Sequence, residues 1–572
     1  MSNESLANTF QLIADLLEIK GENVYKVLAY RRAAESILQQ SQDVSSLDIP
    51  SLIMIPGIGQ AIAEKIQEIH LTGKLEFLEK LETEIPSSII ELLKLQDIGP
   101  KRTALLWKKA NITNIQELEK AASEGNLRQL PGMGTRIEQR ILENIQLLKQ
   151  APIYINISSA LENAEDWLHY LGKTKYFSRL EIAGSIRRGK PNIHDIDLVA
   201  ASSQPSELMA VFLKSPKMDR VLSEGRYMSS IVQRNGLQVQ LWIHPAERFG
   251  TLYQFVTGSK EHNVHLREVA QKQGFSLSER GLIVDSDMQE IFCAQEEHLY
   301  QHLNMPWTPP ELREDRGEIQ AALENTLPQL IRREDIIADL HMHSNWSDGR
   351  NSLEELATRA IKDGLKVLAF TDHSPKWEKI GALNEERIKQ RKTELERIQQ
   401  KVGDQILLLQ GVEVDILPDG SLDFPDEVLC GMDVVVASLH EDLDQSKEQI
   451  TARLIAAIHN PHVDIIGHPN GKEEGKHPGA DANWDKVFRA ASLNNTSLEI
   501  NSHPCHLELD EYRAQQAAKI GVPISINTDT HQLDEFSNLR FGVGIARRAW
   551  LQKENIINSW PVPKILAWLK RD

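Results

Sequence analysis

The spacing of apolar residues divides the chain into distinct kinds of segment. Residues 1 to 150 carry apolar positions three and four apart, as in LANTFQLIADLLEI and IEQRILENIQLL, which predicts helix after helix. From about residue 153, runs such as RLEIAGS, DIDLVAAS and LQVQLWIH predict strands mixed with helices. Residues 303 to 335 carry prolines and charges, which is typical of a connector. After Ile336, short apolar strands alternate with helical stretches in the manner of an α/β barrel.

Three similar glycine turns interrupt the N-terminal helices: IPGIGQAIAEKI, LQDIGPKRTALL and LPGMGTRIEQRI. Such a turn opening a helix exposes backbone N–H groups that hold a phosphate without side-chain charge. It resembles the helix-hairpin-helix DNA-binding motif, and three copies favour DNA binding over a plain tight turn between helices. The middle copy is the weakest, because Asp97 stands where the first glycine belongs. The predicted DNA-binding residues are Gly57, Gly59, Gly99, Gly132 and Gly134.

Length and charge refine this picture. A chain of 572 residues is too long for one hydrophobic core, so the protein is expected to be modular. The net charge of −18 argues at first against nucleic acid, but residues 317 to 572 carry 29 Lys and Arg against 41 Asp and Glu, whereas residues 1 to 316 carry 35 against 41. A DNA groove is therefore expected in the N-terminal part. Without a long apolar run or an apolar leader, we expect a cytoplasmic protein with no membrane contact. A monomer is expected.

The C-terminal part carries a set of metal-binding residue types at the ends of predicted strands. DLHMHSNWSDG places two histidines two residues apart, so on a strand both rings project from one face. In a barrel the strand ends converge on one face, where residues scattered along the sequence can meet. Any one such histidine alone is more often an ordinary core or surface residue. The nine candidate ligands are His341, His343, Asp348, His373, Glu413, His440, His468, Asp529 and His531.

This set resembles, motif by motif, the PHP (polymerase and histidinol phosphatase) phosphoesterase family. The resemblance implies two or three divalent metals, manganese, zinc or iron, and hydrolysis of a phosphoester by a metal-activated water. One departure lies in EINSHPCHLEL, where His506 stands in place of an arginine that is usual in the polymerase-linked branch. A weaker or pH-dependent contact with substrate phosphate is expected there.

AGSIRRGKPNIHDIDLVAAS combines a glycine-serine turn, two arginines and two aspartates separated by one residue. On a strand, Asp195 and Asp197 point to the same side and can hold two Mg²⁺ ions around a triphosphate; otherwise they are solvated strand-end carboxylates. The arrangement resembles the palm of family X DNA polymerases, and with the downstream TGSKEHN the domain order is similar to that of the bacterial members across nearly the whole chain. The resemblance implies Mg or Mn in an active palm, with dNTPs held by Gly184, Ser185, Arg188, Gly258, Asn263 and Arg267.

Several positions depart from the family pattern. A third palm aspartate that accepts the primer proton is replaced by Gln240 in VQLWI, and an amide cannot act as a general base. Met228 takes the place of a lysine, Trp242 that of an arginine, and Val256 alters the usual QYFTGS segment. We therefore expect weak or absent polymerisation. Lys65 matches the lysine that removes a 5′ deoxyribose phosphate, but a surface lysine on a DNA-binding helix is the favoured interpretation.

The predicted fold is multidomain, mixing α+β and α/β parts: helix-hairpin-helix segments, a nucleotidyltransferase palm with a thumb, and a distorted (β/α)7 PHP barrel. The predicted domains are 1–85 (lyase-like), 86–150 (fingers-like), 151–245 (palm), 246–315 (thumb-like), a linker at 316–335, and 336–572 (PHP).

The leading functional hypothesis is metal-dependent 3′–5′ exonuclease action on gapped, nicked or 3′-ended DNA in repair. The runner-up is a dual enzyme that also fills gaps with dNTPs. A non-catalytic scaffold that binds gaps and a small-molecule phosphatase akin to histidinol phosphatase remain as alternatives.

Overall fold

A computed structural model describes residues 3–38, 44, 47–72, 75–93, 98–149, 154–376, 381–473 and 477–569. The chain divides into two compact units, Met1–Ile153 and Tyr154–Asp572. Asp97 of the middle glycine turn lies outside the described residues. Among the helices that the structure describes, none has the length and apolar character needed to cross a membrane.

The first unit is helical, as predicted. Its helices are α1 (Asn3–Lys20), α2 (Val24–Leu38), α3 (Ile49–Ile53), α4 (Gln60–Thr72), α5 (Glu76–Glu84), α6 (Ser87–Leu92), α7 (Pro100–Ala110), α8 (Ile115–Ser123) and α9 (Thr135–Lys149). Helices α4, α7 and α9 each begin at the residue after the second glycine of a predicted turn. The first glycines, Gly57 and Gly132, have φ of 92° and 74°, a backbone region in which a side chain is strained. The repeat therefore corresponds to three helix starts of the same kind.

The second unit begins with a mixed sheet. Its strands and helices are β1 (Ile155–Asn156), α10 (Ile157–Gly172), β2 (Arg179–Ile182), α11 (Gly184–Arg187), β3 (Asn192–Ile193), β4 (Asp195–Ala201), α12 (Pro205–Leu213), β5 (Met218–Ser223), β6 (Met228–Gln233) and β7 (Gln238–His244). The strand order is β2-β4-β7-β6-β5, and only β4 and β7 pair in parallel. Helices α10 and α12 cover one face, with Trp167 and Phe212 buried between helix and sheet. The sheet thus fixes the strand that carries the two predicted palm aspartates.

The thumb-like region follows the sheet. It contains α13 (Phe249–Thr257), α14 (Lys260–Lys272), β8 (Phe275–Ser278), β9 (Gly281–Val284), β10 (Glu290–Ile291), α15 (Glu296–His302) and α16 (Glu318–Leu323). Helix α16 lies inside the predicted linker, and its Glu318 is fully buried, with a carboxylate oxygen 2.7 Å from Nδ1 of His262. Charge and proline content alone did not indicate this packing, because Glu318 is buried only through a partner 56 residues away. The exact domain boundaries remain predictions.

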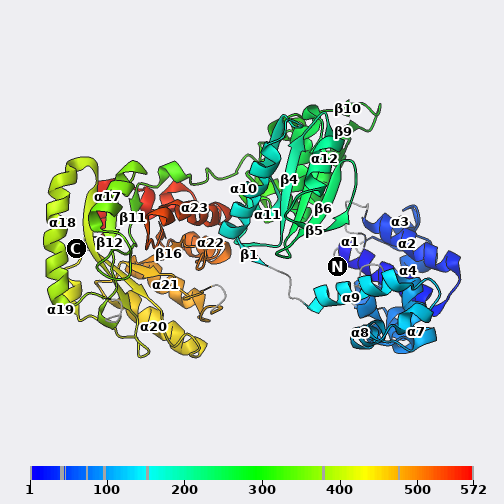
Figure 1. Cartoon of the computed structure of the whole chain (residues 1–572), viewed down its shortest axis with the longest axis horizontal. Helices are drawn as coiled ribbons and strands as arrows, with labels where there is room; N and C mark the ends of the chain where they lie inside the picture. Colours follow the sequence, from blue (N-terminus) through cyan, green and yellow to red (C-terminus); the bar gives the residue numbers. More distant parts are fainter. Residues whose placement is uncertain are drawn as a thin grey trace. The chain divides into compact units, whose positions relative to one another are not determined.

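The C-terminal region is a seven-stranded parallel sheet in sequence order (Figure 1). Its strands are β11 (Ala338–Asp339), β12 (Val367–Phe370), β13 (Leu407–Asp415), β14 (Val434–Ser438), β15 (Ile465–Gly467), β16 (Ser497–Asn501) and β17 (Ile524–Asn527). Its helices are α17 (Leu353–Lys362), α18 (Glu385–Val402), α19 (Asp426–Leu429), α20 (Lys447–His459), α21 (Trp484–Asn494), α22 (Glu511–Lys519), α23 (Leu539–Arg548) and α24 (Val562–Leu569). A parallel bridge between Met342 and Thr530 joins the continuations of the first and last strands. The sheet is therefore a nearly closed barrel, which confirms the predicted fold class.

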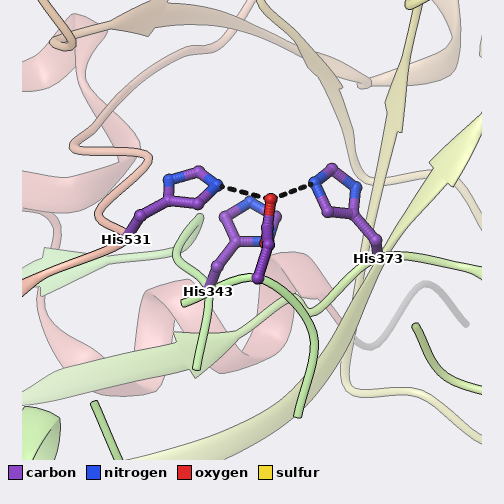
Figure 2. A group of neighbouring side chains, drawn as sticks. His343, His373 and His531 are labelled. Atoms are coloured by element: carbon purple, nitrogen blue, oxygen red, sulfur yellow. Dashed lines mark ion pairs between the residues drawn. The ribbon is translucent and has the colours of Figure 1, made fainter. Parts of the chain in front are cut away.

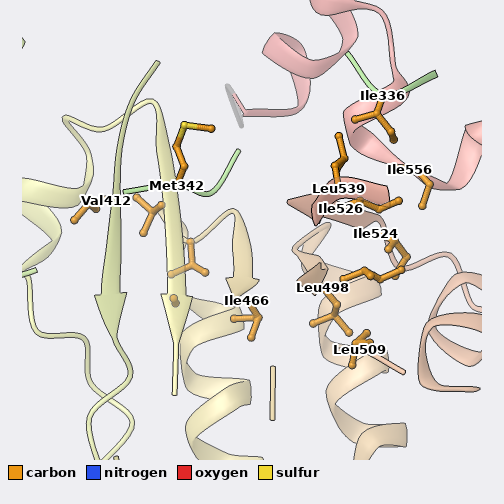
Figure 3. Close-up of a cluster of buried hydrophobic side chains, with 14 of the residues drawn as sticks. Ile336, Met342, Val412, Ile466, Leu498, Leu509, Ile524, Ile526, Leu539 and Ile556 are labelled. Atoms are coloured by element: carbon orange, nitrogen blue, oxygen red, sulfur yellow. The ribbon is translucent and has the colours of Figure 1, made fainter. Parts of the chain in front are cut away.

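Alternate strand residues build two apolar layers in this barrel. Leu368, Val435 and Ile466 pack outward with the helices, and Figure 3 shows part of this layer around Ile466, Leu498 and Ile524. The inward residues cluster with Trp568 of α24. Because both faces are buried, the strands are largely apolar runs, and their polar residues either lie where the strands end or, like Glu413 and Glu499, are buried within them.

A buried ion pair joins the thumb-like region to the palm, and it leads to a stability prediction. Glu296 receives hydrogen bonds from Arg313 (2.8 Å) and, through both oxygens, from Arg187 (2.8 and 2.6 Å). Burial raises the pKa of Glu296, but the two arginines outweigh it and lower that pKa to about 2. Because the folded pKa lies below the unfolded one, the stabilisation is present above about pH 4.5. It is lost as the pH falls toward 2.

We predict that Glu296→Gln lowers the melting temperature at pH 7, because it leaves the fully buried Arg313 without its counter-charge, at a cost of about 3–5 kcal/mol. The difference from the wild type should shrink at pH 3, where protonation of Glu296 begins to offset it. Thermal unfolding followed by circular dichroism measures both values. Glu297→Gln, the exposed neighbour on α15, is the matched control. An equal loss in both variants would contradict the pairing argument.

Candidate metal centre and palm site

The barrel delivers the nine predicted ligands to one end of its sheet. His341 and His343 follow β11, His373 follows β12, and Glu413 lies within β13. His440 and His468 follow β14 and β15, and Asp529 and His531 follow β17. Asp348 comes from the loop between β11 and α17. Residues spread over 190 positions of sequence therefore reach one site because parallel strands end at the same edge.

The carboxylate of Glu413 lies at the centre of this site. Its Oε1 is 3.0 Å from Nε2 of His468 and 3.4 Å from Nε2 of His440. Its Oε2 is 3.0 Å from Nδ1 of His373 and 3.5 Å from Nε2 of His343. The two oxygens thus face different histidines, which is the arrangement of a carboxylate that can bridge two metal ions.

A second carboxylate, Asp348, faces the opposite side of the same group. Its Oδ2 lies 3.3 Å from Nε2 of His531 and 3.5 Å from Nε2 of His373, while Oδ1 lies 3.6 Å from Nδ1 of His343. Figure 2 shows the rings of His343, His373 and His531 converging on one point. These donors form a compact pocket of mixed nitrogen and oxygen ligands.

Four overlapping groups of donors describe the whole site. They are His343, Asp348, His373 and His531; His341, His343 and Asp529; His341, Glu413 and His468; and His373, Glu413 and His440. Within each group the donor atoms lie within 4.8 Å of one another, and every predicted ligand belongs to at least one group. The structure thus brings all nine residues together, which indicates a site for several metal ions. That each one binds metal stays a prediction.

The donors themselves fit divalent metals. Nε2 of His341 and both ring nitrogens of His343 are buried and make no hydrogen bond of acceptable geometry among the described residues. Burial raises the pKa of Glu413, yet the surrounding histidines, first among them His373, hold it well below its usual range. A buried, ionised carboxylate close to ring nitrogens that make no hydrogen bond among the described residues is what a zinc, manganese or iron site provides.

A further layer of polar side chains, which the sequence did not indicate, orients the ligands. Glu499 on β16 is fully buried, with Oε1 2.8 Å from Nδ1 of His341, and it accepts a hydrogen bond from the backbone N of His468. Asp415 contacts Nδ1 of His440 in the same way. A carboxylate inside an otherwise apolar strand, as in SLEIN, is the signal that points to such residues. Fixing one ring nitrogen leaves the other to face a metal.

A cleft of about 600 Å³ opens beside the site, lined by His440, His468, His477 and His506. The ring of His506 stacks on that of His468 with centroids 5.2 Å apart, and its Nδ1 is 2.6 Å from the carbonyl oxygen of Lys472. Burial, followed by the neighbouring His468, lowers the pKa of His506 to about 4. His506 is therefore neutral at pH 7, at the position where the resemblance to the polymerase-linked branch predicted an arginine.

The palm residues meet around a second cleft of about 520 Å³. Gly184, Ser185, Arg188, Asp195, Asp197, Gly258, Asn263 and Arg267 all line it, together with Gln240, Trp242 and Phe255. Glycine is required at position 184, where φ is 59° and an added Cβ would lie 2.0 Å from Oδ2 of Asp197. Burial and the adjacent Asp195 raise the pKa of Asp197 to about 8. Asp195 and Asp197 both line this cleft, so together they fit a divalent cation.

Gln240 occupies the position of the missing third aspartate. It lies opposite Asp197 in the pairing of β4 with β7, and its Nε2 donates a 3.0 Å hydrogen bond to Oδ2 of Asp195. The amide therefore binds one of the oxygens that a metal would need. It also leaves the cleft without a group there that can accept a proton at neutral pH.

Lys65 lies on α4, with Nζ 5.1 Å from the centre of the Phe77 ring and 3.4 Å from the carbonyl oxygen of Ala61. Neither contact activates an amine as a nucleophile. The role of Lys65 in lyase chemistry stays a prediction without structural support.

Comparison with known proteins agrees with this architecture. The helix-hairpin-helix domain matches residues 1–75, the SAM-like helix-hairpin-helix tandem 89–146, the DNA polymerase beta thumb 252–314, and the PHP domain 339–503. The C-terminal part is similar to probable phosphatases of Thermoanaerobacter sp. (strain X514) and Vibrio parahaemolyticus, at 30% and 29% identity. Those matches cover 41% and 39% of this chain and 95% and 90% of the relatives.

The fold and the two sites define a chain that joins a DNA-binding, polymerase-like part to a PHP barrel. Along its whole length it is similar to the DNA polymerase/3'-5' exonuclease PolX of Bacillus subtilis (strain 168), with 33% identity over 575 residues and complete coverage of both chains. The chain belongs to the PolX family of bacterial family X DNA polymerases that carry a PHP domain.

We predict that Glu413→Gln lowers the number of metal ions bound per chain, because it removes the charge that lies between two groups of histidines. Elemental analysis of the desalted protein by mass spectrometry measures the stoichiometry. Glu427→Gln, an exposed carboxylate on α19, is the control and should keep the full complement. Equal metal content in the two variants would contradict the central role of Glu413.

Proposed function

We propose that the PHP domain hydrolyses phosphodiesters at the 3′ ends of DNA, as a metal-dependent 3′–5′ exonuclease. The single observation that carries this proposal is the convergence of the nine candidate ligands, Glu413 among them, beside an open cleft. Two or three ions of manganese, zinc or iron are the proposed occupants, because mixed imidazole and carboxylate donors suit all three metals. Divalent metals in such a site supply a water nucleophile at neutral pH and stabilise the leaving alkoxide.

The residues of this chain would hold and shape that site. Glu499 and Asp415 fix the rings of His341 and His440, so both ligands keep their orientation through a turnover. His477 and His506 line the cleft through which a DNA end would enter. A neutral His506 would contact a phosphate by hydrogen bonding only, which lets a product phosphate leave more easily than a buried arginine would.

DNA is the proposed substrate, rather than a small phosphate ester, because of the first unit. Three helix starts with glycine turns can hold phosphates through backbone N–H groups, and the family matches over residues 1–75 and 89–146 are to helix-hairpin-helix domains. The B. subtilis relative is named for exonuclease as well as polymerase activity. The small-molecule phosphatase alternative does not account for this unit.

The palm is proposed to bind a dNTP with Mg²⁺ but to incorporate it slowly. Ser185 supports nucleotide binding, because its buried hydroxyl has no hydrogen-bond partner among the described residues and lines the cleft. The bond from Gln240 to Asp195 argues against fast chemistry. The loss of a general base alone costs about 10²–10⁴-fold in rate.

We predict that His341→Ala lowers Mn²⁺-dependent shortening of a 5′-labelled single-stranded oligonucleotide by more than about 100-fold, because even partners of metal ligands are worth 10- to 100-fold. The exposed His459→Ala on α20 is the control and should leave the rate unchanged. Wild-type protein should hydrolyse p-nitrophenyl phosphate far more slowly than DNA. Preferred hydrolysis of the small ester would favour the phosphatase alternative.

We predict that Gln240→Asp raises single-nucleotide incorporation on gapped DNA by about 10²-fold or more, since it restores a carboxylate beside Asp195 and Asp197. Primer extension under single-turnover conditions measures the rate. Adding Asp197→Ala to Gln240→Asp should abolish the gain. Wild-type incorporation as fast as that of Gln240→Asp would show that the amide is no handicap.

A further inference from the structure

A buried arginine of the PHP domain forms hydrogen bonds with residues of the palm and of the thumb-like region. Arg548, at the end of α23, is 2% exposed and pairs with Glu511 of α22 through Nε (3.2 Å) and Nη2 (2.6 Å). Its Nη1 donates to Oε1 of Glu314 and to the backbone carbonyl oxygen of Arg188, both at 2.9 Å. One guanidinium group thus connects the barrel with a residue that lines the palm cleft.

The same glutamate holds the side chain of Arg188. Nε of Arg188 donates to Oε1 of Glu314 at 3.0 Å, so this one oxygen accepts from both arginines. Nη1 of Arg188 donates to the carbonyl oxygen of Thr257, at the end of α13. Arg188 is therefore fixed at its carbonyl by the barrel and at its guanidinium by Glu314 and Thr257.

The backbone next to Arg188 lies beside the barrel. Gly189 has φ of 66°, and a Cβ added there would be in ordinary van der Waals contact with Cδ of Arg548, at 3.8 Å, and with Cα of Gly544, at 3.9 Å. The direct link between this turn and α23 is the hydrogen bond from Arg548 to the carbonyl oxygen of Arg188.

Arg548 also places its positive charge beside the carboxylate of Glu314. Burial raises the pKa of Glu314, but Arg188 and Arg548 outweigh it and lower that pKa to about 2. Glu314 therefore carries a full negative charge close to a cleft that would receive a triphosphate. Without Arg548, that charge would be left with Arg188 and with Lys190, whose Nζ lies 3.3 Å from Oε2 of Glu314. It would then compete more strongly with a triphosphate for the guanidinium of Arg188 and repel the ligand.

We propose that Arg548 of the PHP domain is a positioning residue for the nucleotide site of the palm: it neutralises Glu314 and holds Arg188 in place for a triphosphate. The inference rests on the proposed binding of a dNTP in the palm. Occupancy of the palm and the packing of the barrel against it are then energetically coupled, in both directions.

The adjacent residue offers a matched control. Arg547 spans the same boundary, with Nε and Nη2 donating to Glu311 (2.7 and 3.2 Å) and Nη1 to the carbonyl oxygen of Ile331 (3.0 Å). Among the residues that the structure describes, it forms no hydrogen bond or ion pair with Arg188 or Glu314. Arg547→Met and Arg548→Met therefore each remove a partly or fully buried ion pair between the barrel and the thumb-like region. Only the second change should alter the palm site.

The test is calorimetric binding of a non-hydrolysable dATP analogue with Mg²⁺ to the full chain, combined with melting temperatures. We expect Arg548→Met to weaken binding about 10-fold and Arg547→Met to change it less than about 2-fold, within the range of couplings between residues in one network. Arg548→Lys, which keeps the charge but loses the fork of donors, should fall between wild type and Arg548→Met. If Arg548→Met does not fold, Arg548→Lys still tests the proposal.

Binding by Arg548→Met as tight as wild type, with a melting temperature lowered as in Arg547→Met, would show that Arg548 is purely structural and overturn the inference. Arg188→Ala distinguishes a failure of the positioning role of Arg548 from a failure of the proposed nucleotide site. If it loses binding while Arg548→Met and Arg548→Lys do not, only the positioning role fails. If the wild type binds no analogue, the proposed nucleotide site fails together with the inference.

Discussion

The carboxylate of Glu413 is the group around which the C-terminal half of the chain is arranged. A buried negative charge with five histidines at its two oxygens is stable only if cations or protons compensate it. The barrel meets that requirement because the ends of its parallel strands converge: every strand except β16 supplies one or two candidate ligands, and β16 supplies Glu499, which contacts His341. The apolar layers on both faces of the strands keep those ends in register. The positions of the strand ends therefore determine both the fold of this domain and the location of its candidate metal site.

The palm also contains neighbouring carboxylates, but an amide lies beside them in place of a set of histidines. Burial and the neighbouring Asp195 raise the pKa of Asp197 to about 8, and Gln240 offers Asp195 an amide N–H. That hydrogen bond satisfies one carboxylate oxygen but supplies neither a third ligand charge nor a base. The cleft keeps both aspartates, and the amide at position 240 is the reason for the slow incorporation that we propose. The barrel, by contrast, brings all nine candidate ligands together.

Much of this could be predicted from sequence, because the signals are local. The paired histidines of DLHMHS and the aspartates of DIDL lie two apart on strands, and the glycine turns repeat a short pattern. Contacts between distant residues could not be predicted. Glu499 meets His341 across 158 residues, and Arg548 meets Arg188 across 360. Glu318 lies in a segment whose prolines and charges indicated a linker, yet its partner His262 draws it into the core.

We propose that hydrolysis in the barrel, and not synthesis in the palm, is the main activity of this protein. The most direct measurement is a gel assay on a 5′-labelled gapped primer-template with Mn²⁺ and dNTPs, comparing wild type, His341→Ala and Asp197→Ala. We expect shortening that is lost in His341→Ala and kept in Asp197→Ala, with little extension in any lane. Robust extension by the wild type that disappears in Asp197→Ala, without shortening, would contradict it.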